Sequence, residues 1–182
     1  MKVLLVNLCS DPLSELEFIE PVKNIIESSG FEALTKRYAK ICSEDLKIAE
    51  KIIICGTALK DDDFLRHIDK FKWLKKINKP VLGVGSGLMP IAHVFGCKII
   101  NQLKIGAFEV NLIKRNKLID KERFYSYFLT KAVIQASNPM EVLARTENID
   151  CMIKHKDKEI YGCLFHPEAT NSEIILNFLL KI

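Results

Sequence analysis

The sequence has no apolar run of about 18 residues, the length that a membrane-spanning helix needs. Its first residues form an apolar, strand-like run and do not have the layout of a signal peptide. We therefore expect a protein of the cytoplasm that has no membrane partner.

Paired cysteine motifs are also missing. None of the six cysteines belongs to a C-x-x-C pair, the spacing typical of zinc sites. Several lie within apolar runs, which is typical of buried free thiols in a reducing compartment. We therefore expect no disulfide, metal or cofactor. The six are Cys9, Cys42, Cys55, Cys97, Cys151 and Cys163.

The chain lacks a dense basic tract, although its net charge is +4. The lysines of residues 70–79 have the spacing of a solvent-facing helix surface, and the alternative is a patch for acidic partners. We expect no nucleic-acid partner. With 182 residues, 48% of them hydrophobic, the chain is long enough for one domain with a full-sized core, spanning residues 1–182.

The first half of the sequence alternates strand-like and helix-like segments. Strands are expected at residues 2–7, 31–38, 51–55 and 80–84, and helices at 12–29, 61–77 and 88–95. Strands that are rich in Val and Ile and separated by helices indicate a parallel sheet covered by helices on both faces. The predicted fold class is therefore three-layer α/β, with a mostly parallel central sheet.

The second half is richer in strands, which we expect at residues 108–114, 141–146, 151–155 and 160–165. We expect these strands to add a small antiparallel extension. The chain should end in a helix that starts after Ser172.

Residues 80–92 (PVLGVGSGLMPIA) form a segment in which chemistry could take place. An apolar strand leads into the turn Gly85-Ser86-Gly87 and then directly into a helix. This is the layout of a nucleophile elbow, whose helix N-terminus can stabilise an anion. The simpler interpretation is a tight strand-to-helix turn that needs glycines for packing.

Residues 161–168 (YGCLFHPE) form a second such segment. His166 follows a strand, and Glu168 lies two residues further on. The two side chains could act as a base and the carboxylate that orients it. A purely structural pair is the alternative.

Together the two segments resemble the class I glutamine amidotransferase family, whose elbow reads much like P-V-L-G-I-C-x-G-x-Q-x-I-A and whose second site reads G-x-x-F-H-P-E. The resemblance covers nearly the whole chain. The chain is similar to the free-standing glutaminase subunit of archaeal GMP synthetases. It implies a flavodoxin-like sheet, a glutaminase reaction without a cofactor, and a synthetase partner that receives the ammonia.

The chain departs from the family at several positions of the implied site. Gly85 takes the place of the nucleophilic cysteine, and Met89 that of a glutamine that contacts the substrate. Only the first glycine of the oxyanion loop is kept, in Gly56-Thr57. The family's Ser-His pair falls on Leu129-Thr130, so that only His166 and Glu168 remain of the catalytic set.

These departures favour an inactive relative that binds a partner enzyme or a small ligand. Two alternatives stay open: an active glutaminase subunit, or a hydrolase in which Ser86 or Cys55 has become the nucleophile. The acidic run 61–63 could suggest a metal, but helix N-termini favour acidic residues in any case. If the elbow exists, Gly85 should have a positive φ angle.

Overall fold

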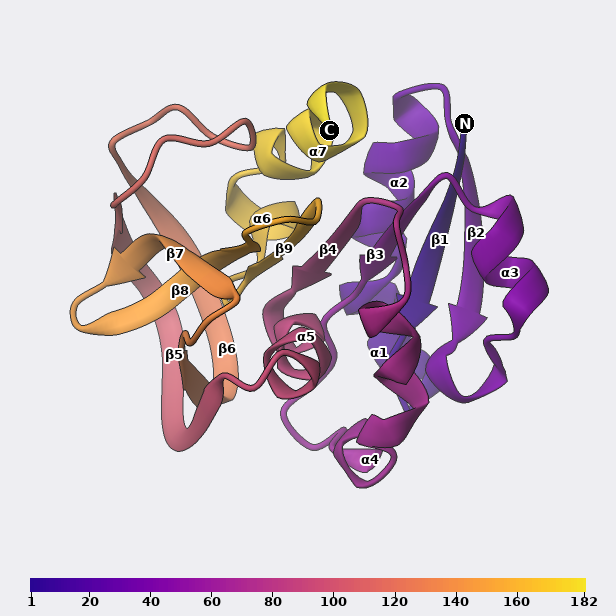
Figure 1. Ribbon diagram of the computed structural model, residues 1–182, viewed down its shortest axis with the longest axis horizontal. Helices are drawn as coiled ribbons and strands as arrows, with labels where there is room; N and C mark the ends of the chain where they lie inside the picture. The colour runs from indigo at the N-terminus through magenta and orange to yellow at the C-terminus, as the bar shows by residue number, and fades with distance from the viewer.

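A nine-stranded sheet runs through the computed structural model, which describes residues 1–182 (Figure 1). The strand order is β2-β1-β3-β4-β9-β8-β6-β5-β7. The strands are β1 (Lys2–Asn7), β2 (Glu32–Arg37), β3 (Lys51–Ile54), β4 (Val81–Val84), β5 (Lys98–Leu112), β6 (Arg123–Gln135), β7 (Met140–Thr146), β8 (Ile149–His155) and β9 (Ile160–Cys163).

Five strands form the parallel half of the sheet. β2, β1, β3, β4 and β9 pair in parallel, in the 2-1-3-4-5 order of flavodoxin-like folds. Their Val- and Ile-rich segments are buried because helices cover both faces, and Ile52, Ile53 and Ile54 are each fully buried. The predicted positions of these strands are confirmed to within two residues.

The other four strands are antiparallel. β7 pairs with both β5 and β8, and β8 also pairs with β6, so β5 to β8 close into a ring (Figure 1). The sheet is therefore mixed, and its antiparallel part is larger than the small extension that the sequence predicts. The two longest strands of the molecule, β5 and β6, belong to this half.

Strand β6 is absent from the strands that the sequence predicts, and its burial pattern explains why. Along residues 123–130 of β6 the buried positions alternate between phenylalanine and hydroxyl residues, while Tyr125 and Tyr127 face outward and are 66% and 37% exposed. The buried set is Phe124, Ser126, Phe128 and Thr130. Because both faces carry polar and aromatic groups, the period-2 hydrophobic signal is lost.

The predicted helix at residues 12–29 is two helices, α1 (Pro12–Phe18) and α2 (Glu20–Ser28). The break at Ile19 precedes Pro21, which has no N–H for a helical hydrogen bond and restricts the residue before it. Leu16, in α1, is 67% exposed.

The predicted helix at residues 61–77 is also interrupted. It consists of α4 (Asp63–Arg66) and the 3₁₀ helix η2 (Ile68–Lys75), with the break at His67. Phe71 and Leu74 are both buried, because residues three apart share a side of a 3₁₀ helix. Leu65, in α4, is 47% exposed.

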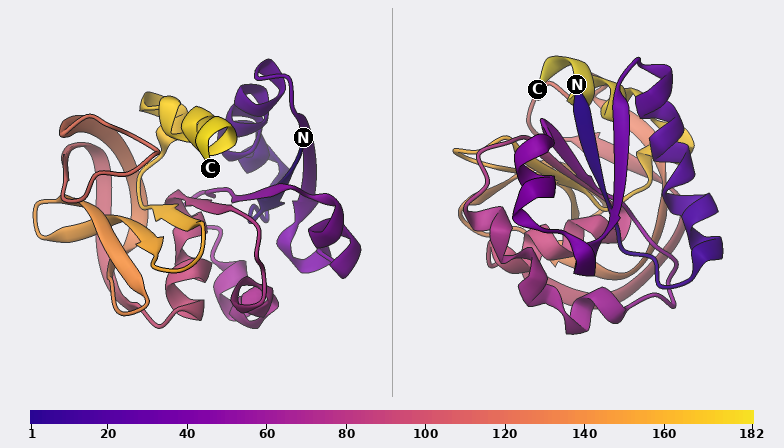
Figure 2. Two further views of the ribbon diagram at one scale, coloured as in Figure 1. Left: turned by 45° about the horizontal axis from the view of Figure 1, so that its top comes forward. Right: turned by 90° about the vertical axis from the view of Figure 1, so that its right-hand side faces the viewer.

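Helices cover both faces of the parallel half, as the right-hand view of Figure 2 shows. On one face α2 packs against α6 (Pro167–Thr170) and α7 (Glu173–Lys181), and on the other α5 (Leu88–Val94) packs against η2. The short helix α3 (Ser43–Ile48) contacts β1. None of the helices is long and apolar enough to cross a bilayer.

Candidate functional site

The sharp turn that the sequence predicts after β4 is present. β4 ends at Val84, Gly85 has φ +55°, and a single 3₁₀ turn, Gly85–Gly87, leads into α5. The predicted positive φ at Gly85 is confirmed, and glycine adopts it without a Cβ clash. The Gly85 N–H donates to Phe165 O (3.2 Å), which ties the turn to the segment that precedes His166.

His166 and Glu168 form a buried pair just beyond β9. The distance from His166 Nδ1 to Glu168 Oε1 is 2.8 Å, and both side chains are only 4% exposed. With Nδ1 donating its proton to the carboxylate, the lone pair of the neutral ring lies on Nε2. His166 Nε2 and Glu168 Oε2 have no hydrogen-bond partner, so each residue keeps one polar atom that can still form a hydrogen bond.

The imidazole of His166 packs directly against two glycines. A Cβ atom placed on Gly85 would lie 2.5 Å from His166 Cε1 and 2.6 Å from Nε2, and one on Gly56 would lie 2.7 Å from Cε1. The Phe18 ring borders the imidazole at a centroid distance of 5.5 Å. The expected proximity of Gly85 and His166 is thus present, but the ring fills the space in which a side chain at position 85 would begin.

The loop after β3 is held by its own hydrogen bonds. The Thr57 N–H donates to Ser86 Oγ (2.9 Å), and Thr57 Oγ1 donates to Asp61 Oδ2 (2.9 Å). Ser10 also donates its hydroxyl to Asp61. The Thr57 amide, which faces the elbow turn and could have served an oxyanion, is therefore satisfied by Ser86 within the chain.

Asp61 is a buried carboxylate at the centre of this network. Burial on its own would raise the pKa of Asp61, but the hydrogen bonds from Ser10 and Thr57 outweigh it and hold this pKa below its usual range. The charged form is thus the one that the folded loop stabilises. The sequence pattern marks Asp61 only as an acid near a helix N-terminus and does not reveal this role.

Replacing Asp61 with Asn should destabilise the fold at neutral pH by about 1–3 kcal/mol, because a charged acceptor of several hydrogen bonds is lost. Since the folded pKa lies below the unfolded one, the contribution is present above the usual aspartate pKa and disappears as the pH falls through the folded value. Urea unfolding of both proteins from pH 7 to pH 3 should therefore show the difference shrinking with acid.

Asp69→Asn is the control for that series, since Asp69 is 77% exposed and pairs only with the exposed Lys72. We expect it to change stability by less than about 0.5 kcal/mol. The role assigned to the network would be contradicted if Asp61→Asn lost no more stability than Asp69→Asn. It would also be contradicted if the stability loss of Asp61→Asn increased as the pH fell.

Most of the predicted pocket residues lie close together, but the cavities that they line are small. Five of them line one cavity of about 60 Å³: Thr57, Ser86, Met89, Leu129 and Thr130. At about 30 Å³ per water, it holds on the order of two molecules. Leu129 also lines a neighbouring cavity of about 180 Å³ with His166 and Glu168. Both are below the range of about 300–1,000 Å³ typical of ligand pockets.

The residues of the His166 cavity that the sequence does not predict include Glu17, Phe18 and Tyr127. Tyr127 lies on the unpredicted strand β6, and its carbonyl accepts the His166 N–H (2.8 Å). Glu17 and Phe18 lie on α1, distant in sequence from both motifs. No local signal marks any of the three, because only tertiary packing brings them to His166.

The geometry disfavours the relocated nucleophiles. Burial raises the pKa of the fully buried Cys55 thiol well above its ordinary value, and that of the nearby Cys9 thiol to about 11. The Ser86 hydroxyl accepts from the Thr57 amide and contacts no base. Neither a thiolate nor an activated serine is therefore favoured here.

The acidic run 61–63 is dispersed rather than gathered around one point. Asp61 binds Ser10 and Thr57, while Asp63 accepts from Tyr38 Oη (2.6 Å). Asp62 lies 3.9 Å from the Arg66 guanidinium. The structure holds no group of three His, Cys, Asp or Glu side chains arranged for a metal ion.

Comparisons with known proteins agree with this architecture. Among solved structures, a protein of Thermoplasma acidophilum named for the A-subunit of GMP synthase has a TM-score of 0.86 at 18% identity, covering 98% of this chain and 92% of that one. A glutamine amidotransferase of Thermotoga maritima has a TM-score of 0.74 at 14% identity, and the match covers 98% of this chain and 80% of that one. At these identities the likeness concerns the fold.

Sequence relatives fall into two groups. Anthranilate synthase component 2 of Saccharolobus solfataricus is 29% identical over 91% of this chain and 94% of its own length. The A-subunit of GMP synthase from Methanosphaera stadtmanae is 34% identical over 54% of this chain and 59% of its own length. GMP synthase of Aquifex aeolicus is 31% identical over 59% of this chain, which spans only 23% of that protein. The family described as "Glutamine amidotransferase class-I" matches residues 15–181, and the chain belongs to this class I glutamine amidotransferase family.

Proposed function

We propose that this protein is a non-catalytic class I amidotransferase subunit, which binds a partner enzyme or a small ligand and does not hydrolyse glutamine. The observation that carries the proposal is the contact between Gly85 and His166, where a Cβ atom would lie 2.5 Å from the imidazole. In this proposal Gly85 stands at the nucleophile position, and His166 and Glu168 are what remains of the catalytic set.

The chemistry of the elbow supports the proposal. Attack on an amide carbon needs a nucleophilic side chain, and glycine has none. The donor that could have faced an oxyanion, the Thr57 amide, is occupied by Ser86 Oγ. The cavity of about 60 Å³ beside Met89 and Leu129 is too small for a glutamine side chain unless the walls move.

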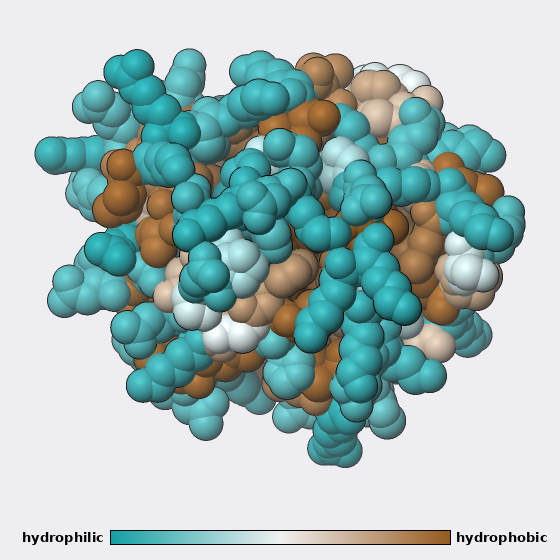
Figure 3. Space-filling view, viewed as in Figure 1, coloured by the Kyte–Doolittle hydropathy of each residue, from teal (hydrophilic) through white to brown (hydrophobic).

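The proposed partner is a synthase of the kind named among the relatives, with no nucleic acid or membrane involved and with action in the cytoplasm. The GMP synthase A-subunit and anthranilate synthase component 2 both carry names of parts of a larger enzyme. In this proposal the shared fold presents the surface that meets the partner. On the face seen in Figure 3, hydrophobic residues form separate patches among hydrophilic ones.

An active glutaminase is the second candidate. Its support is the retained His166–Glu168 pair, at 2.8 Å and with His166 Nε2 unpartnered, together with relatives named glutamine-hydrolyzing. Under this alternative a conformational change, or a residue supplied by a partner, would have to restore a nucleophile near Nε2.

A glutamine-dependent ammonia assay separates the two candidates. The purified protein, alone and with a candidate synthase partner, should release no ammonia above background, since loss of a triad nucleophile lowers turnover by on the order of 10⁶. His166→Ala is the matched control for contaminating glutaminases. Ammonia release that His166→Ala abolishes would contradict the proposal.

A further inference from the structure

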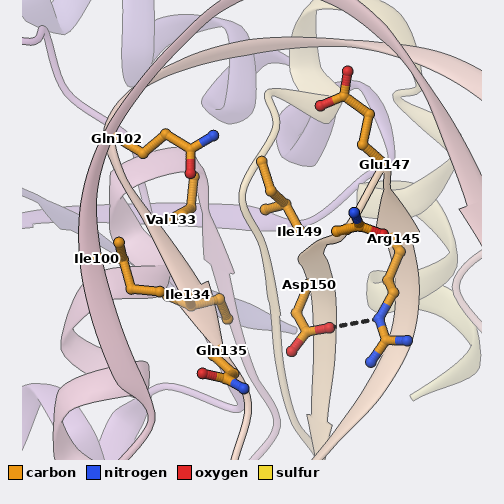
Figure 4. A pocket seen from close by; sticks show the side chains of 10 residues that line it. Ile100, Gln102, Val133, Ile134, Gln135, Arg145, Glu147, Ile149 and Asp150 are labelled. Atoms are coloured by element: carbon orange, nitrogen blue, oxygen red, sulfur yellow. Dashed lines mark hydrogen bonds and ion pairs between the residues drawn. The ribbon is translucent and has the colours of Figure 1, made fainter.

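The ring of antiparallel strands contains a cavity that is separate from the site at Gly85 and His166. Its volume is about 590 Å³, within the range of small-molecule sites. Figure 4 shows it between the β5–β6 pair and the turn that joins β7 to β8. None of its lining residues borders the two cavities near the elbow.

Three backbone irregularities meet at this cavity. The β5–β6 register shifts between Asn101 and Lys104, and the β7–β8 register shifts around Ala144 and Arg145. In the turn between β7 and β8, Glu147 has φ +53° and is the one non-glycine residue with positive φ. β-Bulges change the direction in which side chains point, and residues with strained backbone angles are common at functional sites. The backbone is thus shaped around the cavity instead of forming regular ladders.

The side chains combine an apolar floor with free carboxamides. Ile100, Val133 and Ile149 supply aliphatic surface between the strands (Figure 4). Around them lie Gln102, Gln135 and Asn148, which are exposed and whose carboxamides are free to bind a ligand. Each carboxamide offers an acceptor oxygen beside a donor NH₂ group.

The charges at the cavity compensate one another. Arg145 Nε donates to Asp150 Oδ1 (2.7 Å), and Asp150 also accepts the Ala136 N–H (2.8 Å). Glu147 pairs with Lys104 Nζ at 3.1 Å. Lys104 does not itself line the cavity, but through it and Arg145 each of the two lining acids is paired with a base, so the cavity favours a neutral occupant over an anion or a cation.

We propose that this cavity binds a neutral nucleobase or nucleoside. A flat heterocycle can place its apolar face on the aliphatic floor while its edge offers adjacent donors and acceptors to Gln102 and Gln135. Asn and Gln side chains read the adenine edge in this bidentate way. The site lies apart from the elbow and does not depend on whether glutamine is hydrolysed.

Calorimetric titration with adenosine tests the proposal on the intact chain, with guanosine and cytidine in parallel. We expect a nucleoside to bind, and Gln102→Ala and Gln135→Ala each to weaken that binding by roughly tenfold. Asn24→Ala is the matched control, because Asn24 is an exposed carboxamide on α2 and does not line the cavity. It should leave the affinity unchanged.

Three results would overturn the proposal. One is the absence of binding by all three nucleosides at about 1 mM. Another is equal affinity in wild type, Gln102→Ala and Gln135→Ala, with thermal unfolding showing that both variants are folded. The third is much tighter binding of adenosine monophosphate that Arg145→Ala abolishes, which would make the cavity an anion site.

Discussion

Gly85→Cys should yield a less stable protein that still does not hydrolyse glutamine. The new Cβ would lie 2.5 Å from His166 Cε1, so the imidazole must leave its place beside Glu168, or the elbow must open. Positive φ adds strain for a non-glycine residue. We expect a loss of about 1–3 kcal/mol in urea unfolding and no steady-state turnover of glutamine. Alkylation by iodoacetamide would report whether the new thiol is accessible.

Gly96→Cys is the matched control, because Gly96 also has positive φ (+75°) but a Cβ there would meet nothing within 4 Å. Its loss of stability reports the backbone strain alone. The additional loss of stability in Gly85→Cys therefore measures the clash with His166. Robust glutamine turnover by Gly85→Cys would show that the pocket still recognises glutamine and would favour a recently inactivated enzyme. Equal stability losses in the two variants would contradict the packing of His166 against Gly85.

Gly87→Ala should destabilise the fold even more than Gly85→Cys, by about 3–5 kcal/mol. A Cβ on Gly87 would lie 2.0 Å from Ile54 O and 3.0 Å from Cys55 O, both of them backbone atoms of the β3 segment and its exit. A strand in the middle of the sheet cannot retreat without losing ladder hydrogen bonds. Denaturant unfolding followed by circular dichroism measures the loss directly.

Gly162→Ala provides the comparison for that result. Its Cβ would also make a short contact, 2.2 Å, but with the terminal Cδ1 of Leu88, which can change rotamer. We expect a loss of about 1–2 kcal/mol. If Gly87→Ala were no more destabilising than Gly162→Ala, the close approach of the Gly85–Gly87 turn to the end of β3 would not be what requires glycine at position 87.

The elbow could be predicted from the sequence because the evidence for it is local. Gly85-Ser86-Gly87 follows an apolar strand, and His166 and Glu168 stand two residues apart, so each motif appears within a few positions. Their proximity followed from the family resemblance. Met89, Leu129 and Thr130, which the resemblance assigns to the site, line one cavity with Thr57 and Ser86.

What could not be predicted depends on contacts between distant segments. Whether an apolar strand lies in a parallel or antiparallel pair is decided by its neighbours, so the ring of β5 to β8 was underestimated. The orientation of the His166 ring is set by Phe18 on α1 and by two glycines, none of them adjacent in sequence. The size of the pocket likewise emerges only from the complete packing.

The position of β9 in the sheet has a consequence for the order in which the molecule assembles. β9 is the last of the nine strands along the chain, yet it lies between β4 and β8 and is the strand that joins the parallel half to the antiparallel ring. During synthesis, both halves can form their own pairings before this segment emerges, but they cannot form one continuous sheet without it. Such non-local pairing is slow because loop closure precedes any gain from contacts. His166 lies three residues beyond the end of β9, so its contact with Gly85 would be among the last native contacts to form on the ribosome, after the helices α1 to α5 have already been made.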